Sequence, residues 1–385
     1  MPAPGGAMAR IAVVGAGPSG CSAGFHLARS GHQVVLMDRA VFPRDKTCGD
    51  AVSFGALQAL TAMGVYPAQL EALCVERAAF AGLKLGAPNG AVNAARHTLR
   101  GYCVPRLVFD NLLHERAVSA GCEPLQAHVK ELAALESAYD WVIDARGTHG
   151  GTPTAIAMRS YWDVPTAALD PGEGSDLQIY FERYLGAGYG WIFPVNEVDG
   201  ITRFNVGVGI WLRDYDAAAA NVSTLMQRFS EVNRRARALS GHAVAKERPR
   251  GFHLAGAQRG TRVAAGKQLR VGDAANLVDP ISGEGIQNAL ISGMLVADVI
   301  NSSVSAADVP GNWQRLYEDH YADHLRAGIR YNGLLRFNVV KNLLIWAMNR
   351  SERVSERVNA GIFDLVRYND LGSSLVRSLR ASRRA

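Results

Sequence analysis

Hydrophobic positions at the start of the chain alternate between a strand-like and a helix-like pattern. A short apolar run at 10–14 leads directly into the glycine-rich segment 15–20, and a helical pattern follows to about Arg29. A second apolar run at 33–37 ends in an acid, Asp38. The pattern predicts a β-α-β unit with the glycines placed between the first strand and the helix.

The rest of the chain divides into segments of different periodicity. Alternation between about 157 and 212 is typical of strands and predicts a separate antiparallel sheet, whereas helical patterns dominate after Gly285. The other predicted elements are a helix over 54–70, strands over 80–85 and 91–100, a helix over 108–120 and a buried strand over 141–144. From 334 to 348 an apolar helix is interrupted by two cations, and four arginines lie near the end of the chain.

Composition narrows the class of protein. The chain has 385 residues, of which 48% are hydrophobic and 20% charged, as in globular proteins. A net charge of +6 with interspersed signs is too mild to indicate a nucleic-acid binder, and it suits acidic ligands. Five irregularly spaced cysteines predict neither a disulfide framework nor a metal site, and they favour a reducing cytoplasm. We expect no signal peptide and no membrane-spanning segment.

The glycine segment has the spacing of a dinucleotide-binding fingerprint. Gly15 permits a tight turn, Gly17 allows the backbone to approach a pyrophosphate, and Gly20 allows close helix packing. The helix N-terminus adds N–H groups and a partial positive charge. Asp38, at the end of the second strand, can accept hydrogen bonds from the ribose hydroxyls of an adenosine, and it would repel a 2′-phosphate.

A distant segment extends the motif. Residues 269–276 read as a strand that delivers Gly272 and Asp273 to a loop, and Pro280–Ile286 follows. Together with the fingerprint, this segment resembles the flavoprotein monooxygenase superfamily. The resemblance implies that FAD is the cofactor, that Asp273 holds its ribityl chain, and that the following helix points its N-terminus at the flavin, where the helix dipole stabilises negative charge.

Two further motifs resemble the geranylgeranyl reductase group within that superfamily. They are the loop at 44–51, which contains Lys46-Thr47-Cys48-Gly49, and the Tyr-x-Trp-x-Phe-Pro motif at 189–194. The resemblance implies that Cys48, Tyr189 and Trp191 line the substrate cavity, and we take them as the catalytic candidates. Because Arg44 and Lys46 lie beside Cys48 in sequence, we expect them to lower the pKa of its thiol. A buried, inert cysteine and plain core aromatic residues are the alternatives.

The resemblance also implies the rest of the cofactor site. Arg106 would reach the FAD phosphates or the flavin edge, Ala145 and Gly147 would form a close turn, and main-chain atoms at Val129 would hold the adenine. The predicted cofactor site comprises Gly15, Gly17, Ser19, Gly20, Asp38, Arg39, Arg44, Cys48, Gly49, Asp50, Arg106, Val129, Ala145, Gly147, Gly272, Asp273, Pro280, Gly283, Glu284, Gly285 and Ile286.

The predicted function is therefore that of an FAD-dependent oxidoreductase acting on a small apolar substrate. The resemblance implies reduction of a C=C bond in an isoprenoid- or natural-product-like compound. The alternative is an NAD(P)H- and FAD-dependent monooxygenase; a flavin-dependent halogenase fits less well, because its Trp-x-Trp-x-Ile-Pro motif is not matched at 189–194. No second GxGxxG occurs, so electrons would come from transiently docked NAD(P)H or from a partner protein.

The predicted fold class is α/β, with a Rossmann-type FAD-binding domain, an antiparallel substrate sheet and a C-terminal helical extension. The predicted division is 8–80, 101–155 and 258–300 for the FAD-binding domain, 81–100 and 156–257 for the substrate domain, and 301–385 for the helical region. For the helix at 334–348, packing over the substrate domain competes with a lid or with peripheral membrane contact.

Overall fold

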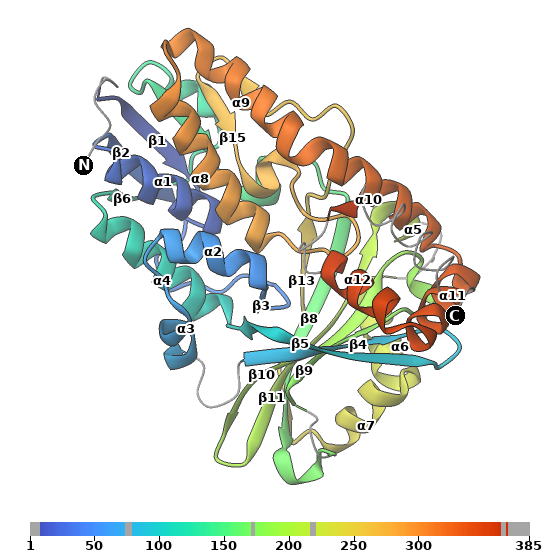
Figure 1. Ribbon diagram of the computed structural model, residues 1–385. Helices are drawn as coiled ribbons and strands as arrows, with labels where there is room; N and C mark the ends of the chain where they lie inside the picture. Colours follow the sequence, from blue (N-terminus) through green and yellow to red (C-terminus); the bar gives the residue numbers. More distant parts are fainter. Residues whose placement is uncertain (1–7, 74–78, 171–173, 216–220, 363–366, 369–385) are drawn as a thin grey trace.

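Two β-sheets organise the chain, which we describe from a computed structural model (Figure 1). The structure describes residues 8–73, 79–170, 174–215, 221–362 and 367–368. Cys74 and the arginines near the end of the chain lie outside these residues.

The smaller sheet has six strands in the order β14-β15-β7-β1-β2-β6. Its strands are β1 (Arg10–Val14), β2 (Gln33–Asp38), β6 (Glu123–Gln126), β7 (Trp141–Asp144), β14 (Ala264–Ala265) and β15 (Gln268–Arg270). All of these pairs are parallel except that between β14 and β15. The carboxyl ends of the central strands therefore meet at one edge, where a doubly wound sheet binds its ligand.

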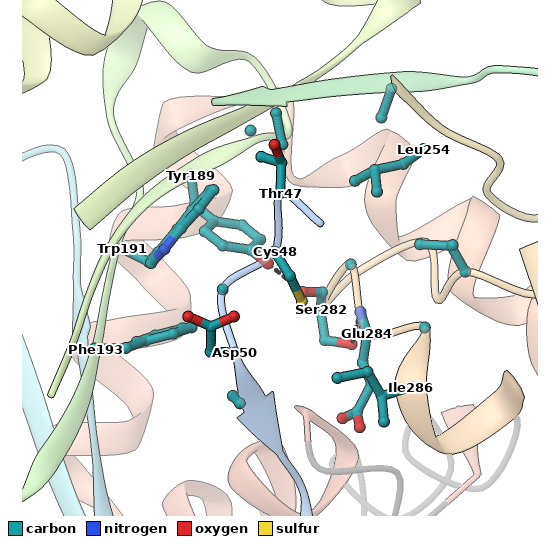
Figure 2. Close-up of a pocket in the computed structure, with 18 of the residues that line it drawn as sticks. Thr47, Cys48, Asp50, Tyr189, Trp191, Phe193, Leu254, Ser282, Glu284 and Ile286 are labelled. Atoms are coloured by element: carbon teal, nitrogen blue, oxygen red, sulfur yellow. Dashed lines mark hydrogen bonds between the residues drawn. The ribbon is translucent and has the colours of Figure 1, made fainter. Parts of the chain in front are cut away.

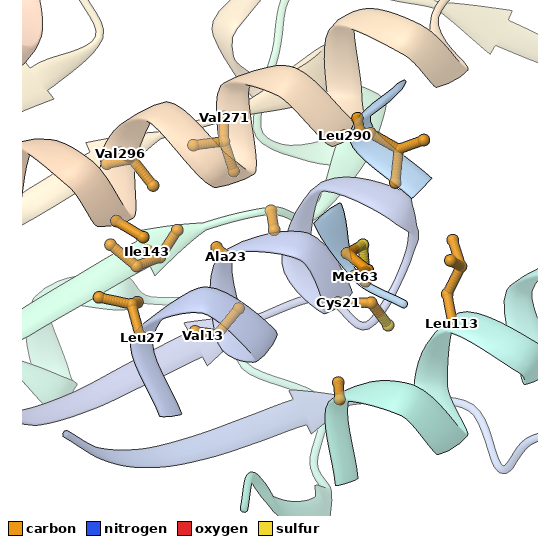
Figure 3. Packing of buried hydrophobic residues seen from close by; sticks show 14 of the residues in the cluster. Val13, Cys21, Ala23, Leu27, Met63, Leu113, Ile143, Val271, Leu290 and Val296 are labelled. Carbon is orange, nitrogen blue, oxygen red and sulfur yellow. The ribbon is translucent and has the colours of Figure 1, made fainter. Parts of the chain in front are cut away.

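Helices cover this sheet and form the main core with it. They are α1 (Pro18–Arg29), α4 (Arg106–Ser119) and α8 (Ile286–Ser302), and α1 contacts both of the others. Figure 3 shows this core, in which Val13 and Ile143 of the strands meet Leu27 of α1 and Val296 of α8, all with 0% exposure. The fingerprint helix is thus held between two helices from distant parts of the chain.

The larger sheet is mostly antiparallel, in the order β12-β8-β11-β10-β9-β4-β5-β3 with β13 also paired to β8. Its strands are β3 (Ala51–Val52), β4 (Ala79–Gly86), β5 (Val92–Cys103), β8 (Ala155–Pro165), β9 (Asp176–Tyr180), β10 (Tyr189–Val198), β11 (Ile201–Trp211), β12 (Ala245–Lys246) and β13 (Arg250–Leu254). The pair β4–β9 is parallel. One face of β8, β10 and β11 packs on α6 (Val222–Val232) and α7 (Arg234–His242).

Shorter helices complete the described chain. They are α2 (Phe54–Ala62), α3 (Pro67–Leu73), α5 (Leu212–Tyr215), α9 (Val309–Tyr317), α10 (Asp323–Leu334), α11 (Asn338–Arg350) and α12 (Glu352–Ile362). Helices α11 and α12 contact β5 of the larger sheet. Among the described helices, none combines the length and the apolar character that crossing a bilayer requires.

The predicted fold class is confirmed, while one predicted element is wrong. The single helix expected over 54–70 is two helices, because Gly64 takes a φ of +72° after α2 and Pro67 begins α3. The short strand β6 had not been predicted; its four residues are all exposed, so it carries no apolar periodicity. The domain boundaries stay a prediction.

Candidate functional site

The loop after β1 is held in place by its own backbone contacts. Gly15 has a φ of +106°, and its N–H donates to the Met37 carbonyl at 2.7 Å. A Cβ on Gly15 would lie 2.2 Å from the Ala145 carbonyl oxygen, and a Cβ on Gly20 would lie 1.7 Å from the Gly15 carbonyl oxygen. These two glycines are therefore required by the packing of the turn itself.

Gly17 differs from its neighbours because it faces open space. A Cβ there would meet only the Arg44 Nη2 atom within 4 Å, at 3.6 Å. Gly17 precedes α1, whose N-terminus carries no side-chain cap. Its α-hydrogens thus face a groove at the carboxyl edge of the smaller sheet, beside backbone N–H groups suited to an anion.

Most of the predicted cofactor residues line this groove. Those that do are Gly15, Gly17, Ser19, Asp38, Arg39, Arg44, Arg106, Val129, Ala145, Gly147 and Asp273. Lys46, Lys130 and Arg146 line it as well, so several cations surround the groove. This charge favours an anionic ligand.

Asp38 has a structural contact that the sequence did not reveal. One carboxylate oxygen accepts the Ala16 N–H at 2.8 Å, and the other accepts the Ala40 N–H at 2.9 Å. The side chain therefore ties the glycine loop to the end of β2. Each carboxylate oxygen retains a further lone pair, so the same group can still accept a hydroxyl from a ligand in the groove.

The groove opens into an apolar cavity between the two sheets (Figure 2). Residues shared by groove and cavity include Pro18, Lys46, Thr47, Arg106, Phe252, Asp273 and Ala289. Apolar side chains that line the cavity include Phe80, Leu177, Ile179, Tyr189, Trp191, Phe193, Leu254 and Ile362. The arrangement can hold a long ligand whose polar part lies in the groove and whose other end meets an apolar molecule.

The aromatic wall of the cavity comes from one strand. Tyr189, Trp191 and Phe193 alternate along β10 and point to the same side, as Figure 2 shows. The Tyr189 hydroxyl donates to the Ser282 carbonyl, which joins the wall to the loop before α8. The Trp191 indole Nε1–H donates to the Asn205 Oδ1 atom at 2.9 Å. The wall is thus fixed at two points by its own polar groups.

Cys48 lies in the cavity, but the predicted effect on its thiol is wrong. Burial raises the pKa of Cys48, and the nearby Arg106 only partly opposes this effect. The two cations beside it in sequence have other partners: Arg44 pairs with Asp110 at 2.8 Å, and Lys46 pairs with Asp273 at 3.8 Å. Cys48 is therefore a neutral thiol.

Arg106 is a buried member of the site. It is 3% exposed and binds Asp110 through two hydrogen bonds of 2.6 and 2.8 Å. The Asp110 carboxylate raises the pKa of Arg106. Because Arg44 also pairs with Asp110, one carboxylate fixes two cations at the junction of groove and cavity.

The loop before α8 closes the other side of the cavity. Gly283, Glu284, Gly285 and Ile286 all line it, and Glu284 accepts the Ser53 hydroxyl at 2.6 Å. Helix α8 begins after Gly285 without a side-chain cap, so its N-terminal N–H groups lie at the cavity. Three predicted cofactor residues, Gly20, Gly272 and Pro280, line neither space.

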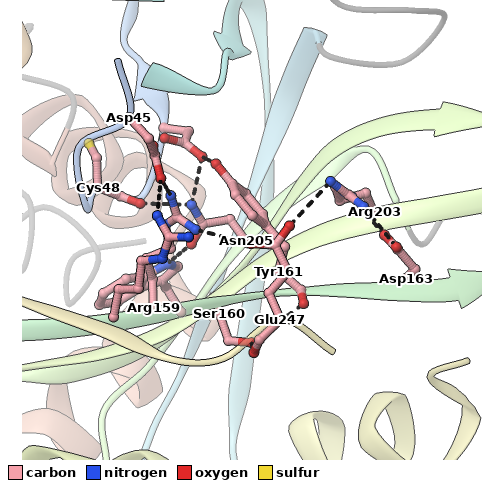
Figure 4. A network of polar contacts seen from close by, with 12 residues as sticks. Asp45, Cys48, Arg159, Ser160, Tyr161, Asp163, Arg203, Asn205 and Glu247 are labelled. Carbon is pink, nitrogen blue, oxygen red and sulfur yellow. Dashed lines mark hydrogen bonds and ion pairs between the residues drawn. The ribbon is translucent and has the colours of Figure 1, made fainter. Parts of the chain in front are cut away.

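Cys48, Gly49 and Asp50 line the apolar cavity and not the groove. Asp50 is 0% exposed and contacts Tyr161 and Asn205. The sequence did not single out these two residues, which Figure 4 labels within a network of polar contacts. Asn205 is a buried polar residue within the apolar alternation of β11, and that departure from the pattern was the available signal.

Known proteins resemble this chain over its fingerprint region and over most of its length. A family model described as an NAD(P)-binding Rossmann-like domain matches residues 13–54. A menaquinone reductase from Mycolicibacterium smegmatis is 29% identical over 349 residues, which cover 82% of this chain and 81% of that protein. A digeranylgeranylglycerophospholipid reductase from Methanopyrus kandleri is 27% identical over 82% of this chain and 86% of its own length.

Solved structures share the fold. A geranylgeranyl bacteriochlorophyll reductase-like protein from Thermoplasma acidophilum has a TM-score of 0.69 at 20% identity, covering 97% of this chain and 100% of that one. A flavin-dependent brominase has a TM-score of 0.70 at 15% identity with the same coverage. With the reductase relatives, these likenesses confirm the resemblance inferred from the sequence motifs.

Proposed function

We propose that this chain, which belongs to the geranylgeranyl reductase-like oxidoreductases, binds FAD in the groove and reduces a C=C bond of an isoprenoid-like substrate in the cavity. The observation that carries the proposal is the direct opening of a cationic dinucleotide groove into an apolar, aromatic-lined cavity. The named reductases among its relatives support a reduction.

The residues of the groove fit FAD. The open side of Gly17 leaves room for a pyrophosphate, and Arg44 lies 3.6 Å from the position of a Cβ there. Asp38 is available at the adenosine end, and Asp273 lines both groove and cavity, where a ribityl chain would pass. The N-terminus of α8 would face the flavin ring. When bound and reduced, FAD supplies a hydride equivalent.

The cavity sets the class of substrate. Its lining is mainly aliphatic and aromatic, so an apolar chain gains free energy by leaving water for it. Among the relatives, one is named for menaquinone and one for a lipid with geranylgeranyl chains. We therefore propose an isoprenoid chain as the substrate, which Tyr189, Trp191 and Phe193 would hold against the flavin while they exclude water.

The test uses the holoprotein under anaerobic conditions. Protein reconstituted with FAD is reduced chemically and mixed with menaquinone or with a geranylgeranyl lipid, and flavin reoxidation is followed by absorbance. We expect reoxidation together with a product that mass spectrometry shows to have gained two hydrogens at the isoprenoid chain. Reduction at the quinone ring alone would contradict the proposed C=C reduction. If the substrate does not reoxidise the flavin without oxygen, and a parallel aerobic sample gives a hydroxylated product, a monooxygenase would be supported instead.

The electron donor is a separate proposal. The sequence holds one complete fingerprint, and Gly15 and Gly17 of that fingerprint line the groove proposed for FAD. We therefore propose that NAD(P)H docks transiently at the cavity mouth. Anaerobic bleaching of the flavin by NADPH or NADH supports this proposal. A protein that bleaches only after a cell extract is added would require a carrier or electron-donor protein instead.

We further propose that the surface of α11 contacts an anionic lipid bilayer. Its inward residues Ile345 and Met348 belong to the apolar cluster around the cavity. Its outward residues Val339, Leu343 and Trp346 are more than half exposed, at 62%, 56% and 52%. The helix is thus apolar on both sides, and its inner side packs in a cluster that includes cavity-lining residues such as Phe80 and Phe193.

Charge complements this apolar surface. Leu334 at the end of α10 and Phe337 in the following turn are also exposed, and the Arg350 guanidinium lies 4.8 Å from the centre of the Trp346 ring. Aromatic residues with adjacent cations are suited to the boundary between headgroups and acyl chains. We expect the protein to float with vesicles that contain phosphatidylglycerol more than with neutral vesicles.

The double variant Leu343→Gln and Trp346→Gln should lose this flotation. Val304→Gln is a matched control, because Val304 is 99% exposed on another part of the surface. The control should float as the wild type does, because it also removes an exposed apolar side chain but at another place. Equal flotation of the double variant and the control would contradict the proposed surface.

A further inference from the structure

We propose that Asp50 is the acid that protonates the substrate carbon during C=C reduction. The proposal rests on the proposed function of the site and gives Asp50 a role on the substrate side rather than in holding the cofactor. Three observations support it. Asp50 lines the apolar cavity, it is 0% exposed, and one of its carboxyl oxygens has no hydrogen-bond partner among the described residues.

The hydrogen bonds around Asp50 determine which oxygen can carry a proton. The indole N–H of Trp191 can only donate, so the Asn205 side chain must turn its Oδ1 atom towards Trp191. The Asn205 Nδ2 group then donates to the Asp50 Oδ2 atom and to the Cys48 carbonyl, both at 2.7 Å. The Tyr161 hydroxyl also donates to Asp50 Oδ2. Oδ2 is thus a double acceptor, and the proton of the neutral acid is carried on Oδ1.

The backbone holds this carboxyl group at the cavity. Asp50 takes a φ of +65°, which a non-glycine residue rarely adopts, and its carbonyl accepts the Val104 N–H at 2.9 Å. The preceding Gly49 lies close to the aromatic wall, since a Cβ there would be 3.1 Å from the Phe193 ring. Figure 2 shows Asp50 among Trp191, Phe193 and Cys48. A substrate against the aromatic wall would therefore lie beside Asp50.

The surroundings of Asp50 determine the pKa of its carboxyl group. Burial raises the pKa of Asp50 to about 6, while Tyr161, Asn205 and the cations Arg159 and Arg106 oppose that rise. Arg159 is itself paired with Asp45 at 2.7 Å, and its guanidinium lies 4.0 Å from the centre of the Tyr161 ring. The neutral thiol of Cys48 adds no charge. A catalytic acid is most effective when its pKa lies close to the working pH.

The proposed step is balanced. One alkene carbon receives a hydride equivalent from the reduced flavin, and the other receives the proton from Asp50 Oδ1, so the C=C bond becomes a C–C single bond and the flavin is oxidised. Asp50 is left as a carboxylate that Tyr161 and Asn205 stabilise through Oδ2. A proton from water restores the acid, and NAD(P)H or another two-electron donor restores the reduced flavin.

The variant Asp50→Asn tests this assignment. Asparagine tolerates a positive φ, and its amide oxygen can accept the bonds of Tyr161 and Asn205, so the fold and the FAD content should be retained. Reduction of the flavin by dithionite should be unchanged. Reoxidation of the reduced flavin by an isoprenoid substrate should be slower by about 100-fold or more, the usual contribution of a general acid. Asp163→Asn is the matched control, because Asp163 pairs with Arg203 on the same sheet and does not line the cavity.

Two pH experiments separate catalysis from structure. Infrared titration of the apoprotein should show a protonated carboxyl band that disappears around pH 6 and is missing from Asp50→Asn. In the wild type, substrate-driven reoxidation should fall as pH rises through the same range, because the acid loses its proton. Tyr161→Phe removes a donor to the carboxylate, so it should raise the pKa and shift both transitions to higher pH.

The outcomes distinguish the two proposals. If wild-type protein reduces the substrate and Asp50→Asn does so at the same rate, or if Tyr161→Phe leaves the pH profile in place, Asp50 is not the acid. If the wild-type holoprotein reduces no isoprenoid substrate at any pH, the proposed function fails and this assignment fails with it. A normal rate in Asp163→Asn shows that loss of a carboxylate from the sheet is not by itself harmful.

Discussion

Replacing Gly17 with valine should block FAD binding while leaving the apoprotein folded. The substitution adds a side chain at the one fingerprint glycine whose Cβ position is open, with only Arg44 Nη2 within 4 Å, at 3.6 Å. Its backbone is extended, with φ −77° and ψ −174°, so a β-branched residue is accommodated without strain. The same space is where a pyrophosphate must lie if the groove binds FAD.

The substitution should change the free energy of unfolding much less than the affinity for FAD. A residue change at the position before α1 should alter the free energy of unfolding of the apoprotein by no more than about 1 kcal/mol. Displacing the phosphates from the helix N-terminus removes roughly two charge-assisted hydrogen bonds of about 1.5–3 kcal/mol each. The affinity for FAD should therefore fall by a factor of about 10² to 10⁴.

The assay measures flavin content and stability on the same samples. After reconstitution, the ratio of flavin to protein absorbance gives the loading, and thermal unfolding of the apoprotein gives the Tm. Gly241→Val serves as a control, because Gly241 also has open space around its Cβ position but lies in α7, away from the groove. Full flavin loading of Gly17→Val would show that the phosphates lie elsewhere and would refute the assignment of the groove.

Other substitutions separate structural from ligand effects. Gly20→Ala should destabilise the apoprotein by about 3 kcal/mol or more, measured by its Tm, because a Cβ there would overlap the backbone of the glycine loop. Asp38→Ala should weaken FAD binding by about 1–3 kcal/mol in a titration and should also lower the Tm of the apoprotein, since both carboxylate oxygens accept backbone N–H groups. Cys48→Ser should keep the FAD content and the Tm but lower the turnover per bound flavin. The wild-type thiol should react with iodoacetamide more slowly than a free cysteine, because burial raises its pKa. The pKa of Asp50 is raised from 3.8 to about 6, so the folded state binds a proton more tightly than the unfolded state. As pH rises from about 4 to 7, the free energy of unfolding of the wild type should therefore fall by about 2–3 kcal/mol relative to that of Asp50→Asn, measured by denaturant unfolding.

The fingerprint could be predicted from sequence because its geometry is local. Gly15 and Gly20 contact each other within one strand-turn-helix, and Asp38 lies at the end of the next strand along the chain. Each requirement is met by neighbours in sequence, so the spacing of the residues carries the information. The aromatic wall on β10 was accessible for the same reason, because alternation along one strand places its residues on one face.

The charge state of Cys48 could not be predicted in this way. The sequence places two cations beside the thiol, but the fold pairs Arg44 with Asp110 of α4 and Lys46 with Asp273 of the loop after β15. Both partners are distant in sequence, and burial of the thiol depends on the whole cavity. Proximity along the chain therefore gave the wrong direction for the pKa.

The register of the larger sheet explains what the sequence pattern of β11 concealed. In β11, Asn205 lies directly opposite Tyr161 of β8, so the two donors to Asp50 are neighbours through strand pairing. Two residues further, Gly207 lies opposite Trp191 of β10, and a Cβ there would be 2.2 Å from the indole ring. Gly207 and Gly209 have the spacing of the first two glycines of a fingerprint but lack the third, and Gly207 makes room for the indole ring instead. The indole in turn fixes the orientation of Asn205, so the absence of a side chain at Gly207 contributes to the hydrogen bonding of Asp50.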